Sequence, residues 1–385
     1  MRPARAQTVE FHSPRHPGNP PRLPHLPGLD GLRALAVIAV LLYHADLGWL
    51  RGGFLGVEVF FVISGYLITS LLLAEWHQIG RIDLPRFWLR RGRRLLPALY
   101  AAIVVVLAYA TLFLPRDVAR LRGDALAAFT YVTNWYLIFR QQSYFEAVGR
   151  PSPLLHLWSL AIEEQFYLLW PLVLAFALRR WPVRRIAIGT VVIAAASTLL
   201  MALLYRPDTD PSAIYYRTDT RLSGLLIGAT LAFTWQPWTR RARVSAARRR
   251  RYEAAGLGAL GALAIYCAVF AETTPFLYLG GFLLVAATTA VAIAMLVAPQ
   301  GRSVAALLDV AAALGRDAPY SLYLWHWPVY VVTRPDRPAV RRFAAAGTPP
   351  GARRGARRTL LPLHRATSPP GVVDSRLAPL PGGAG

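Results

Sequence analysis

The sequence predicts an all-α protein, a polytopic integral membrane helical bundle with about nine spanning helices. Of its 385 residues, 55% are apolar and 16% are charged, whereas a soluble chain carries about a quarter charged residues. Apolar runs of about twenty residues recur, the length that a bilayer core about 30 Å thick requires. Because backbone polar groups in lipid must be satisfied within the segment, we expect these runs to be helices.

The formal charge of +23 comes entirely from arginine, since the sequence contains no lysine. The arginines cluster between the apolar runs, so membrane topology explains them better than nucleic-acid binding does. We therefore expect the lipid bilayer as a partner, and no nucleic acid. The single cysteine, Cys267, excludes an intrachain disulfide.

The N-terminal segment, 1–28, is rich in proline and arginine and is predicted to be disordered and cytoplasmic. The first helix, about 30–48, then runs outward. The second, about 53–75, returns to the arginine-rich segment 81–94, and the third, about 95–114, leaves again.

Segment 125–140 is predicted to be re-entrant or interfacial. If it crossed the membrane, the next apolar run, 156–178, would place the arginines of segment 179–185 outside, against the positive-inside rule. The remaining spans are predicted at about 186–205, 220–236, 254–271, 275–297 and 318–333.

Ionisable side chains within spans are costly and indicate function by default. Arg33 and His44 lie eleven positions apart in the first helix, which is about 16 Å and close to three whole turns, so both project from one face. They could be a snorkelling arginine and an interfacial histidine. As a functional pair, Arg33 suits binding of a phosphate, and His44 suits proton transfer.

Glu58, in the second helix, is either an outer-interface residue or the partner of a nearby base. His156, Ser159 and Glu163 stand at i, i+3 and i+7 and give one helix face a polar stripe. Glu164 falls about 100° off that face, so Glu163 is the better candidate for the interior. The stripe could also simply bind a neighbouring helix. No metal is expected, because paired ligands on a helix prefer i, i+3 or i+4 spacing.

Two further charged motifs lie in the second half of the chain. Arg217, Asp219 and Arg221 mark the outer end of the 220–236 helix, where they could contact an acceptor or pair with one another. His326 stands between two tryptophans deep in the last run, and a histidine at mid-span is a candidate for function.

Together these motifs resemble the type-3 membrane acyltransferase family, bacterial proteins that O-acylate carbohydrates and other hydroxyl-bearing acceptors. The resemblance covers about 29–333 and rests on LDGLRALAVIAVLLYH (29–44), GFLGVEVFFVISGYLI (53–68), SPLLHLWSLAIEEQFYLLWP (152–171), YYRTDTRLSGLLIGA (215–229) and YSLYLWHWPV (320–329).

The resemblance implies an O-acyltransferase of groups other than aminoacyl groups. It would use acyl-CoA, normally acetyl-CoA, as co-substrate without a permanently bound cofactor, and a carbohydrate, glycolipid or other lipid-linked acceptor. It also implies a multi-pass protein of the bacterial plasma (inner) membrane with a cytoplasmic N-terminus. The family's arginine and histidine of the first helix fall on Arg33 and His44, and its glutamate falls on Glu163.

In this interpretation Arg33 binds the donor and His44 is the general base. Glu163, or Glu58, would orient the imidazole of His44, as a carboxylate does in a catalytic triad. His156, Arg221 and His326 would support the site. Tyr167 and Ser159 are candidate oxyanion donors, and both direct transfer and an acyl-histidine route are open.

The C-terminal segment, 334–385, is predicted to be an Arg/Pro/Gly-rich tail, disordered or frame-shifted, because no run in it can span. The resemblance implies ten spanning helices, so the acyltransferase domain, 29–333, would be C-terminally incomplete. We hypothesise a shifted reading frame or a truncation after about Pro335.

Two rival functions remain open. Intramembrane His, Glu and Arg also mark proton pathways, so a polytopic transporter or flippase is one alternative; it would show inverted repeats, and the sequence has no such symmetry. The other is a catalytically inactive, truncated remnant.

Overall fold

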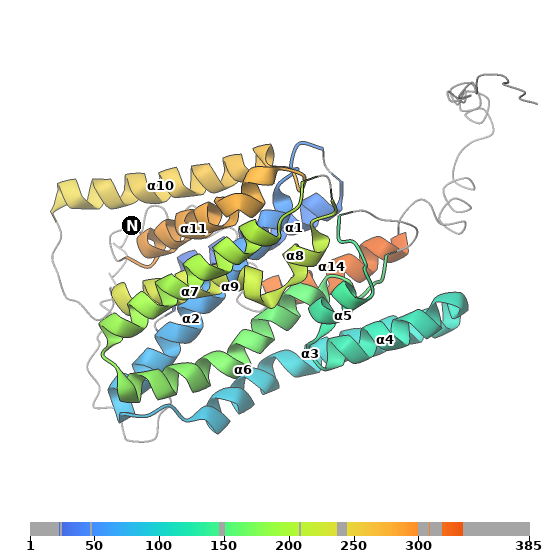
Figure 1. The fold of residues 1–385 in the computed structure, drawn as a ribbon, viewed down its shortest axis with the longest axis horizontal. Coiled ribbons are helices and arrows are strands. Elements are labelled where there is room, and N and C mark those ends of the chain that lie inside the picture. Colours follow the sequence, from blue (N-terminus) through green and yellow to red (C-terminus); the bar gives the residue numbers. More distant parts are fainter. Residues whose placement is uncertain are drawn as a thin grey trace, which may run out of the picture. The chain divides into compact units, whose positions relative to one another are not determined.

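The nine predicted apolar runs are all helical in the computed structural model (Figure 1). The structure describes residues 23, 25–46, 48–145, 151–207, 209–236, 245–298, 308 and 318–333. Over these residues the regular structure is helical throughout, without strands. Most of the predicted N-terminal segment and all of the predicted tail, 334–385, lie outside the described residues.

Seven of the described helices are long and apolar enough to cross a membrane. They are α1 (Pro27–His44), α2 (Gly56–Ile79, extended at its start by the 3-10 turn Gly53–Leu55), α3 (Leu84–Phe113), α6 (Leu157–Arg180), α7 (Val183–Leu204), α10 (Ala246–Val269) and α11 (Phe282–Leu296, preceded by the π-helical turn Leu277–Gly281). The predicted polytopic helical membrane protein is therefore confirmed.

The two other predicted spans form shorter helices. α9 (Thr218–Thr234) has 17 residues and α14 (Ala318–Thr333) has 16. At 1.5 Å per residue they are about 26 and 24 Å long, somewhat less than the thickness of a bilayer core. A short helix, α8 (Ser212–Tyr216), immediately precedes α9.

The segment predicted as re-entrant or interfacial, 125–140, does not form one helix. α4 (Val118–Phe129) ends at a turn in which Tyr131 has a φ of 56°, and α5 (Thr133–Phe139) follows. A 3-10 turn, Pro115–Asp117, joins α3 to α4. With 12 and 7 residues, α4 and α5 are each too short to span a bilayer.

The predicted start of the third helix, at about residue 95, was wrong. α3 begins at Leu84, where the side chain of Asp83 accepts a hydrogen bond from the backbone N–H of Arg86 and caps the helix. Five of the six arginines of segment 81–94, all but Arg81, therefore lie on the first turns of α3. This difference brings two of them, Arg91 and Arg94, into the candidate site described below.

α2 lies at the centre of the bundle, where it packs against α1, α9 and α11, and α9 packs in turn against α7. Two glycines permit the close approach of α2 and α9. A Cβ atom on Gly65 would meet the carbonyl oxygen of Leu225, and one on Gly228 would meet that of Val62. Because α2 is covered on most sides, its buried residues do not form a single stripe.

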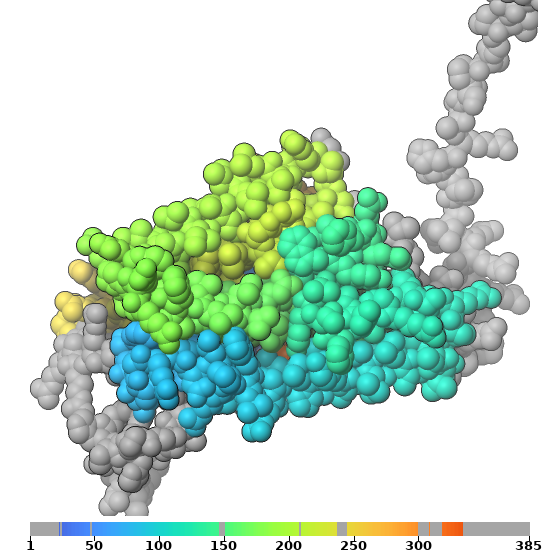
Figure 2. All heavy atoms as spheres, turned by 60° about the horizontal axis from the view of Figure 1, so that its bottom comes forward, coloured from blue at the N-terminus to red at the C-terminus, as the bar shows by residue number. Residues whose placement is uncertain are grey.

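The outward faces of α3, α6 and α7 carry large apolar side chains. Examples with exposed fractions of half or more are Val104 and Leu112 of α3, Leu168 and Phe176 of α6, and Ile188 of α7. Figure 2 shows α3 and α4 (cyan to teal) beside α6 and α7 (green) on one face of the molecule. An apolar surface on spanning helices is the surface that lipid covers.

Candidate functional site

Two groups of polar residues lie at different levels of α1. Arg33 lies in its second turn and His44 is its last residue, so the two are separated by about 16 Å along the helix axis. Arg33 lines a pocket with the arginines of α3, whereas His44 contacts residues of α14 and of the segment that follows α5. The two predicted residues thus belong to two distinct clusters.

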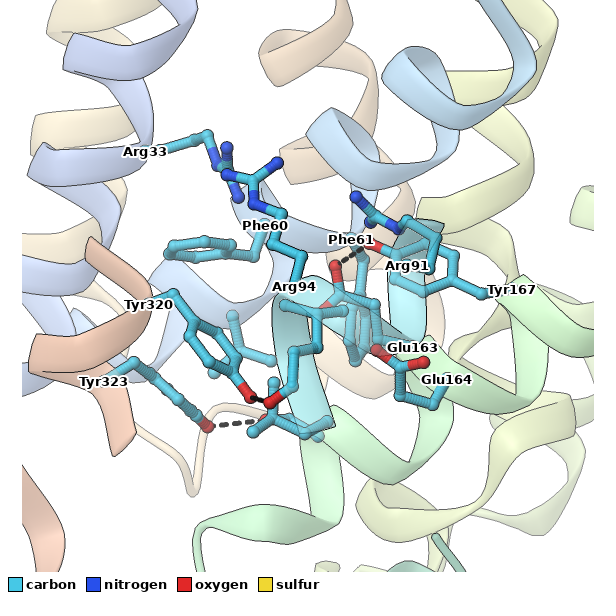
Figure 3. Close-up of a pocket in the computed structure, with 14 residues that line it drawn as sticks. Arg33, Phe60, Phe61, Arg91, Arg94, Glu163, Glu164, Tyr167, Tyr320 and Tyr323 are labelled. Carbon is cyan, nitrogen blue, oxygen red and sulfur yellow. Dashed lines mark hydrogen bonds between the residues drawn. The ribbon is translucent and has the colours of Figure 1, made fainter. Parts of the chain in front are cut away.

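The first cluster is a pocket between α1, α2, α3, α6 and α14, with about 650 Å³ of empty space, part of it open to solvent. Its polar lining consists of three arginines, two glutamates, three tyrosines and one serine: Arg33, Arg91, Arg94, Glu163, Glu164, Tyr167, Tyr320, Tyr323 and Ser159. In Figure 3 the side chains of Arg33 and Arg94 reach the same side of the pocket, and Arg91 lies beside Tyr167. We call this cavity the arginine pocket.

The arginine pocket carries an excess of positive charge, with three guanidinium groups against two carboxylates. One carboxylate, Glu163, accepts hydrogen bonds from the hydroxyl groups of Ser64 and Tyr167. The guanidinium of Arg91 lies 4.3 Å from the ring centre of Tyr167. The Nε atoms of Arg33 and Arg91 are buried and have no hydrogen-bond partner among the described residues. These groups can therefore donate to an anionic ligand.

The second cluster joins three histidines from three elements. His44 Nδ1 lies 3.1 Å from His326 Nε2, and His44 Nε2 lies 3.0 Å from the hydroxyl oxygen of Tyr144. The ring of His156 is 5.4 Å from that of His326, and the ring of Trp327 is 4.6 Å from that of His44. His156 and His326 are buried, while His44 is half-buried. We call this group the histidine cluster.

Tyr144 lies in the segment between α5 and α6, outside the spanning helices. Burial, reinforced by neighbouring tyrosines of which Tyr215 comes first, raises the pKa of its phenol well above the ordinary value. The phenol is therefore protonated at neutral pH, and its hydroxyl group can donate to His44 Nε2 or accept from it, depending on the tautomer of His44.

One residue, Tyr323 of α14, belongs to both clusters. Its ring lines the arginine pocket, and its hydroxyl lies 2.5 Å from Ser159 Oγ and 3.1 Å from the carbonyl oxygen of His156. Its own carbonyl oxygen lies 2.6 Å from Nδ1 of His326. The arginine pocket thus reaches the residue that supports the histidine cluster.

The structure does not bring either predicted carboxylate, Glu163 or Glu58, to His44. The hydrogen-bond partners of Glu163 are Ser64 and Tyr167, and neither Glu163 nor Glu58 contacts His44 among the described residues. The physical reason is the direction of α6: Glu163 lies seven residues, or about 10 Å, beyond His156 and so at the level of Arg33.

Glu58 is instead the partner of a base, one of the two alternatives that the sequence left open. Its carboxylate lies 2.7 Å from Arg221, and both side chains are fully buried between α2 and α9. The guanidinium of Arg221 is also 4.1 Å from the ring centre of Phe282 and 4.8 Å from that of Tyr215. The pair is therefore enclosed by aromatic rings.

Arg217 and Asp219 pair with each other just before and at the start of α9, with 2.9 Å between Nε and Oδ1. This hydrogen bond raises the pKa of Arg217. Both side chains are partly exposed. The three charged residues of this motif therefore do not form one group. Arg221 lies in the protein interior, whereas Arg217 and Asp219 lie near the surface.

Sequence reasoning missed six residues of the two clusters: Arg91, Arg94, Glu164, Tyr144, Tyr320 and Tyr323. Arg91 and Arg94 stand at i and i+3 and so lie on the same face of α3. This relation can be recognised from the sequence only when the helix is predicted to begin at Leu84. Glu164 lines the arginine pocket although it lies about 100° from Glu163 around α6. Tyr144 lies in an irregular segment that carries no periodic signal.

The chain matches the family model described as acyltransferase domain over residues 26–345. Peptidoglycan O-acetyltransferase OatA of Listeria monocytogenes is 44% identical over 302 residues, which cover 77% of this chain and 48% of that protein. O-acetyltransferase OatA of Staphylococcus aureus (strain NCTC 8325) is 42% identical over 292 residues, covering 76% and 48%. This chain thus spans about half the length of the curated relatives it matches.

No solved structure gives a significant match. The family model covers most of the chain, and it covers every residue of the arginine pocket and of the histidine cluster. The family predicted from the motifs is therefore confirmed, and the chain belongs to the type-3 membrane acyltransferases.

Proposed function

We propose that this protein is a membrane O-acyltransferase that moves an acyl group, in the first instance acetyl, from acyl-CoA to a hydroxyl group of a cell-envelope carbohydrate. The observation that carries the proposal is the continuity of the site: Tyr323 belongs both to the arginine pocket and to the support of His44 through His326. Tyr323 thus connects the arginine pocket, which can bind an anionic donor, with the histidine cluster, which can transfer a proton.

The donor is proposed to bind in the arginine pocket. Coenzyme A carries several phosphate groups, and guanidinium groups bind phosphate through paired hydrogen bonds. Arg33, Arg91 and Arg94 supply three such groups on two helices. The positive-inside rule places the arginine-rich start of α3 in the cytoplasm, where acyl-CoA is found. The acyl arm would then extend along α1 toward His44.

His44 is proposed to be the general base. Its Nε2 takes the proton of the acceptor hydroxyl as the hydroxyl oxygen attacks the carbonyl carbon of the thioester. The new C–O bond forms, the C–S bond breaks, and the departing thiolate of coenzyme A takes up the proton from His44. The products are the O-acyl ester and free coenzyme A, and His44 returns to its starting state.

The acceptor that we test first is peptidoglycan, because the Listeria relative is named as a peptidoglycan O-acetyltransferase. His44 ends α1 at the end opposite to the arginine pocket. With the N-terminus in the cytoplasm, this end faces the outer side of a bacterial plasma membrane, where such an acceptor is accessible.

The test is release of free coenzyme A thiol from acetyl-CoA by the full chain in lipid nanodiscs, with and without soluble peptidoglycan fragments. We expect thiol release that depends on the acceptor, with the O-acetylated fragment detected by mass spectrometry. Transport of a solute by reconstituted protein without thiol release would favour the transporter. Neither activity, from protein that is folded and binds acetyl-CoA, would favour the inactive remnant.

A further inference from the structure

We propose that His326 is a positioning residue that fixes the tautomer of His44, so that Nδ1 carries the proton and Nε2 is the basic nitrogen. The catalytic meaning of this inference rests on the proposed function, in which His44 is the base. The tautomer itself follows from the chain of contacts around the two imidazoles, and it can be measured without any assay of acyl transfer.

The carbonyl oxygen of Tyr323 can only accept a hydrogen bond. His326 Nδ1 lies 2.6 Å from this oxygen, so Nδ1 must carry a proton. A neutral imidazole has only one N–H group, which leaves Nε2 of His326 as an acceptor. His44 Nδ1, 3.1 Å away, must then be the donor. His44 Nε2 therefore has the lone pair, and it accepts the hydrogen bond of Tyr144.

This tautomer of His44 requires His326 to be neutral, and the surroundings of His326 favour the neutral state. The side chain is buried, and its neighbours include a second imidazole, that of His156, at a ring distance of 5.4 Å. No carboxylate among the described residues contacts it. A buried cation without a counter-ion is strongly unfavourable, so the neutral form with a proton on Nδ1 is the one that fits.

A proline holds His326 in place. Pro328 has no N–H, so the carbonyl oxygen of Leu324, four residues earlier in α14, loses its helical hydrogen bond. His156 replaces that bond, with Nε2 3.1 Å from the Leu324 oxygen. On the other side of His326, Trp327 Nε1 donates to the carbonyl oxygen of Ser152 at 2.8 Å. Two hydrogen bonds thus fasten α14 to segment 152–156 and fix the position of the His326 ring.

His326 would thus do for His44 what a carboxylate does in a catalytic triad. There, a buried acceptor beside Nδ1–H keeps the other nitrogen available as the base, and loss of that acceptor allows the wrong tautomer. In this protein the acceptor is a neutral imidazole whose own proton is committed to a backbone carbonyl. This explains why neither Glu163 nor Glu58 needs to contact His44.

The experiment compares two near-isosteric substitutions, His326→Gln and His326→Asn. The amide of glutamine reaches the place of Nε2, so its oxygen can accept from His44. The amide of asparagine reaches only the place of Nδ1, where it can donate to Tyr323 but cannot reach His44. The full chain is labelled with ¹⁵N-histidine in nanodiscs, and His44→Gln identifies the signals of His44 among the eight histidines.

We expect His44 to be protonated on Nδ1 in the parent and in His326→Gln, and to populate the Nε2–H tautomer in His326→Asn. Acyl transfer at saturating donor should stay within about tenfold of the parent in His326→Gln and should fall at least about 100-fold in His326→Asn, with unchanged half-saturation by donor. Thermal unfolding of both variants shows that each is folded, and His326→Ala serves as the complete removal.

A parent in which His44 carries its proton on Nε2, or a tautomer unchanged in His326→Asn, would overturn the inference. Equal losses of activity in the two variants, with equal losses of thermal stability, would show a merely structural role and would also overturn it. If instead the parent shows no acyl transfer, the proposed function fails, and the nitrogen spectra still decide the tautomer.

Discussion

His44 and His326 lie within 3.1 Å of each other although they are separated by 282 positions in the sequence. The contact joins the last residue of α1 to the middle of α14, the first and the last of the described helices. The proposed base is therefore assembled only when both ends of the acyltransferase region are in place. Any change that displaces α14 should affect His44 before it affects the arginine pocket as a whole.

Replacing the proposed base should abolish the reaction without preventing insertion of the protein. We expect His44→Ala to reduce acceptor-dependent release of coenzyme A by about 100-fold or more, the range typical of general base catalysis. The matched control is His77→Ala, since His77 is exposed near the end of α2. Equal activity of His44→Ala and His77→Ala would exclude His44 as the base.

Replacing Arg33 by lysine should weaken donor binding while it preserves the charge. Lysine cannot form the paired hydrogen bonds of a guanidinium, so we expect the half-saturating concentration of acetyl-CoA to rise about tenfold, equivalent to about 1.4 kcal/mol. The rate at saturating donor should change little. Arg179→Lys, at the exposed end of α6, is the control for lysine substitution in a basic segment.

Arg91 should bind the same anionic donor as Arg33. If Arg33 and Arg91 contact the same anionic donor, Arg91→Lys should raise the half-saturating concentration as well, and high salt should weaken binding in the parent. A rise in half-saturation for Arg33→Lys that is matched by Arg179→Lys would show that the effect of losing a guanidinium group is not specific to the arginine pocket.

Much of the fold could be predicted because lipid imposes long apolar runs, and these give a strong periodic and compositional signal. The positions at which individual helices begin and end could be predicted less well. The start of α3 depends on a single cap, Asp83, and that cap lies in front of a run of arginines that looks like a loop. The break at Tyr131 depends on local backbone geometry that no composition reveals.

Several residues of the two clusters could be singled out from the sequence, but the contacts between them could not be predicted. Arg33, His44, Glu163 and His326 each stood out as polar groups in apolar runs. Which of these side chains contact one another depends on the depth at which each lies along the axes of the packed helices. The antiparallel course of α1 and α6 places Glu163 with Arg33 and leaves His44 with His326, a relation between helices that the spacing within one helix cannot contain.

The buried pair of Glu58 and Arg221 should be critical for stability. Both side chains have no exposure, so removing one partner leaves an unpaired buried charge and should cost about 3–5 kcal/mol. We expect Glu58→Gln and Arg221→Gln each to lower the Tm in detergent. The double substitution should cost less than the sum of the single ones, because it removes both charges.

The control for the Glu58–Arg221 pair is the partly exposed ion pair of Arg217 and Asp219. Solvent screens such a pair, so Asp219→Asn should change the free energy of unfolding by no more than about 1 kcal/mol. Similar losses for Glu58→Gln and Asp219→Asn would mean that the interior pair is not decisive for stability.

Asp124 of α4 should make stability depend on pH. Its side chain is buried, and Oδ2 has no hydrogen-bond partner among the described residues. Burial, opposed by a hydrogen bond from Ser152 and by Arg120 and Arg140, raises the pKa of this carboxyl. A raised folded-state pKa favours the protonated form, so its contribution to stability is fully present below the unfolded pKa of about 3.9 and is lost as pH rises through the folded pKa.

Where the carboxyl group of Asp124 is ionised, its burial opposes folding, and Asp124→Asn removes the charge while it keeps the shape. We expect this variant to have a higher Tm than the parent at pH values above the folded-state pKa of Asp124, and the difference to shrink as the pH is lowered through that pKa and the parent carboxyl becomes protonated. The measurement is thermal unfolding in detergent across that range. A Tm difference that is constant with pH would show that ionisation of Asp124 does not affect stability. The effect of Asp124→Asn would then come from the change in hydrogen bonding.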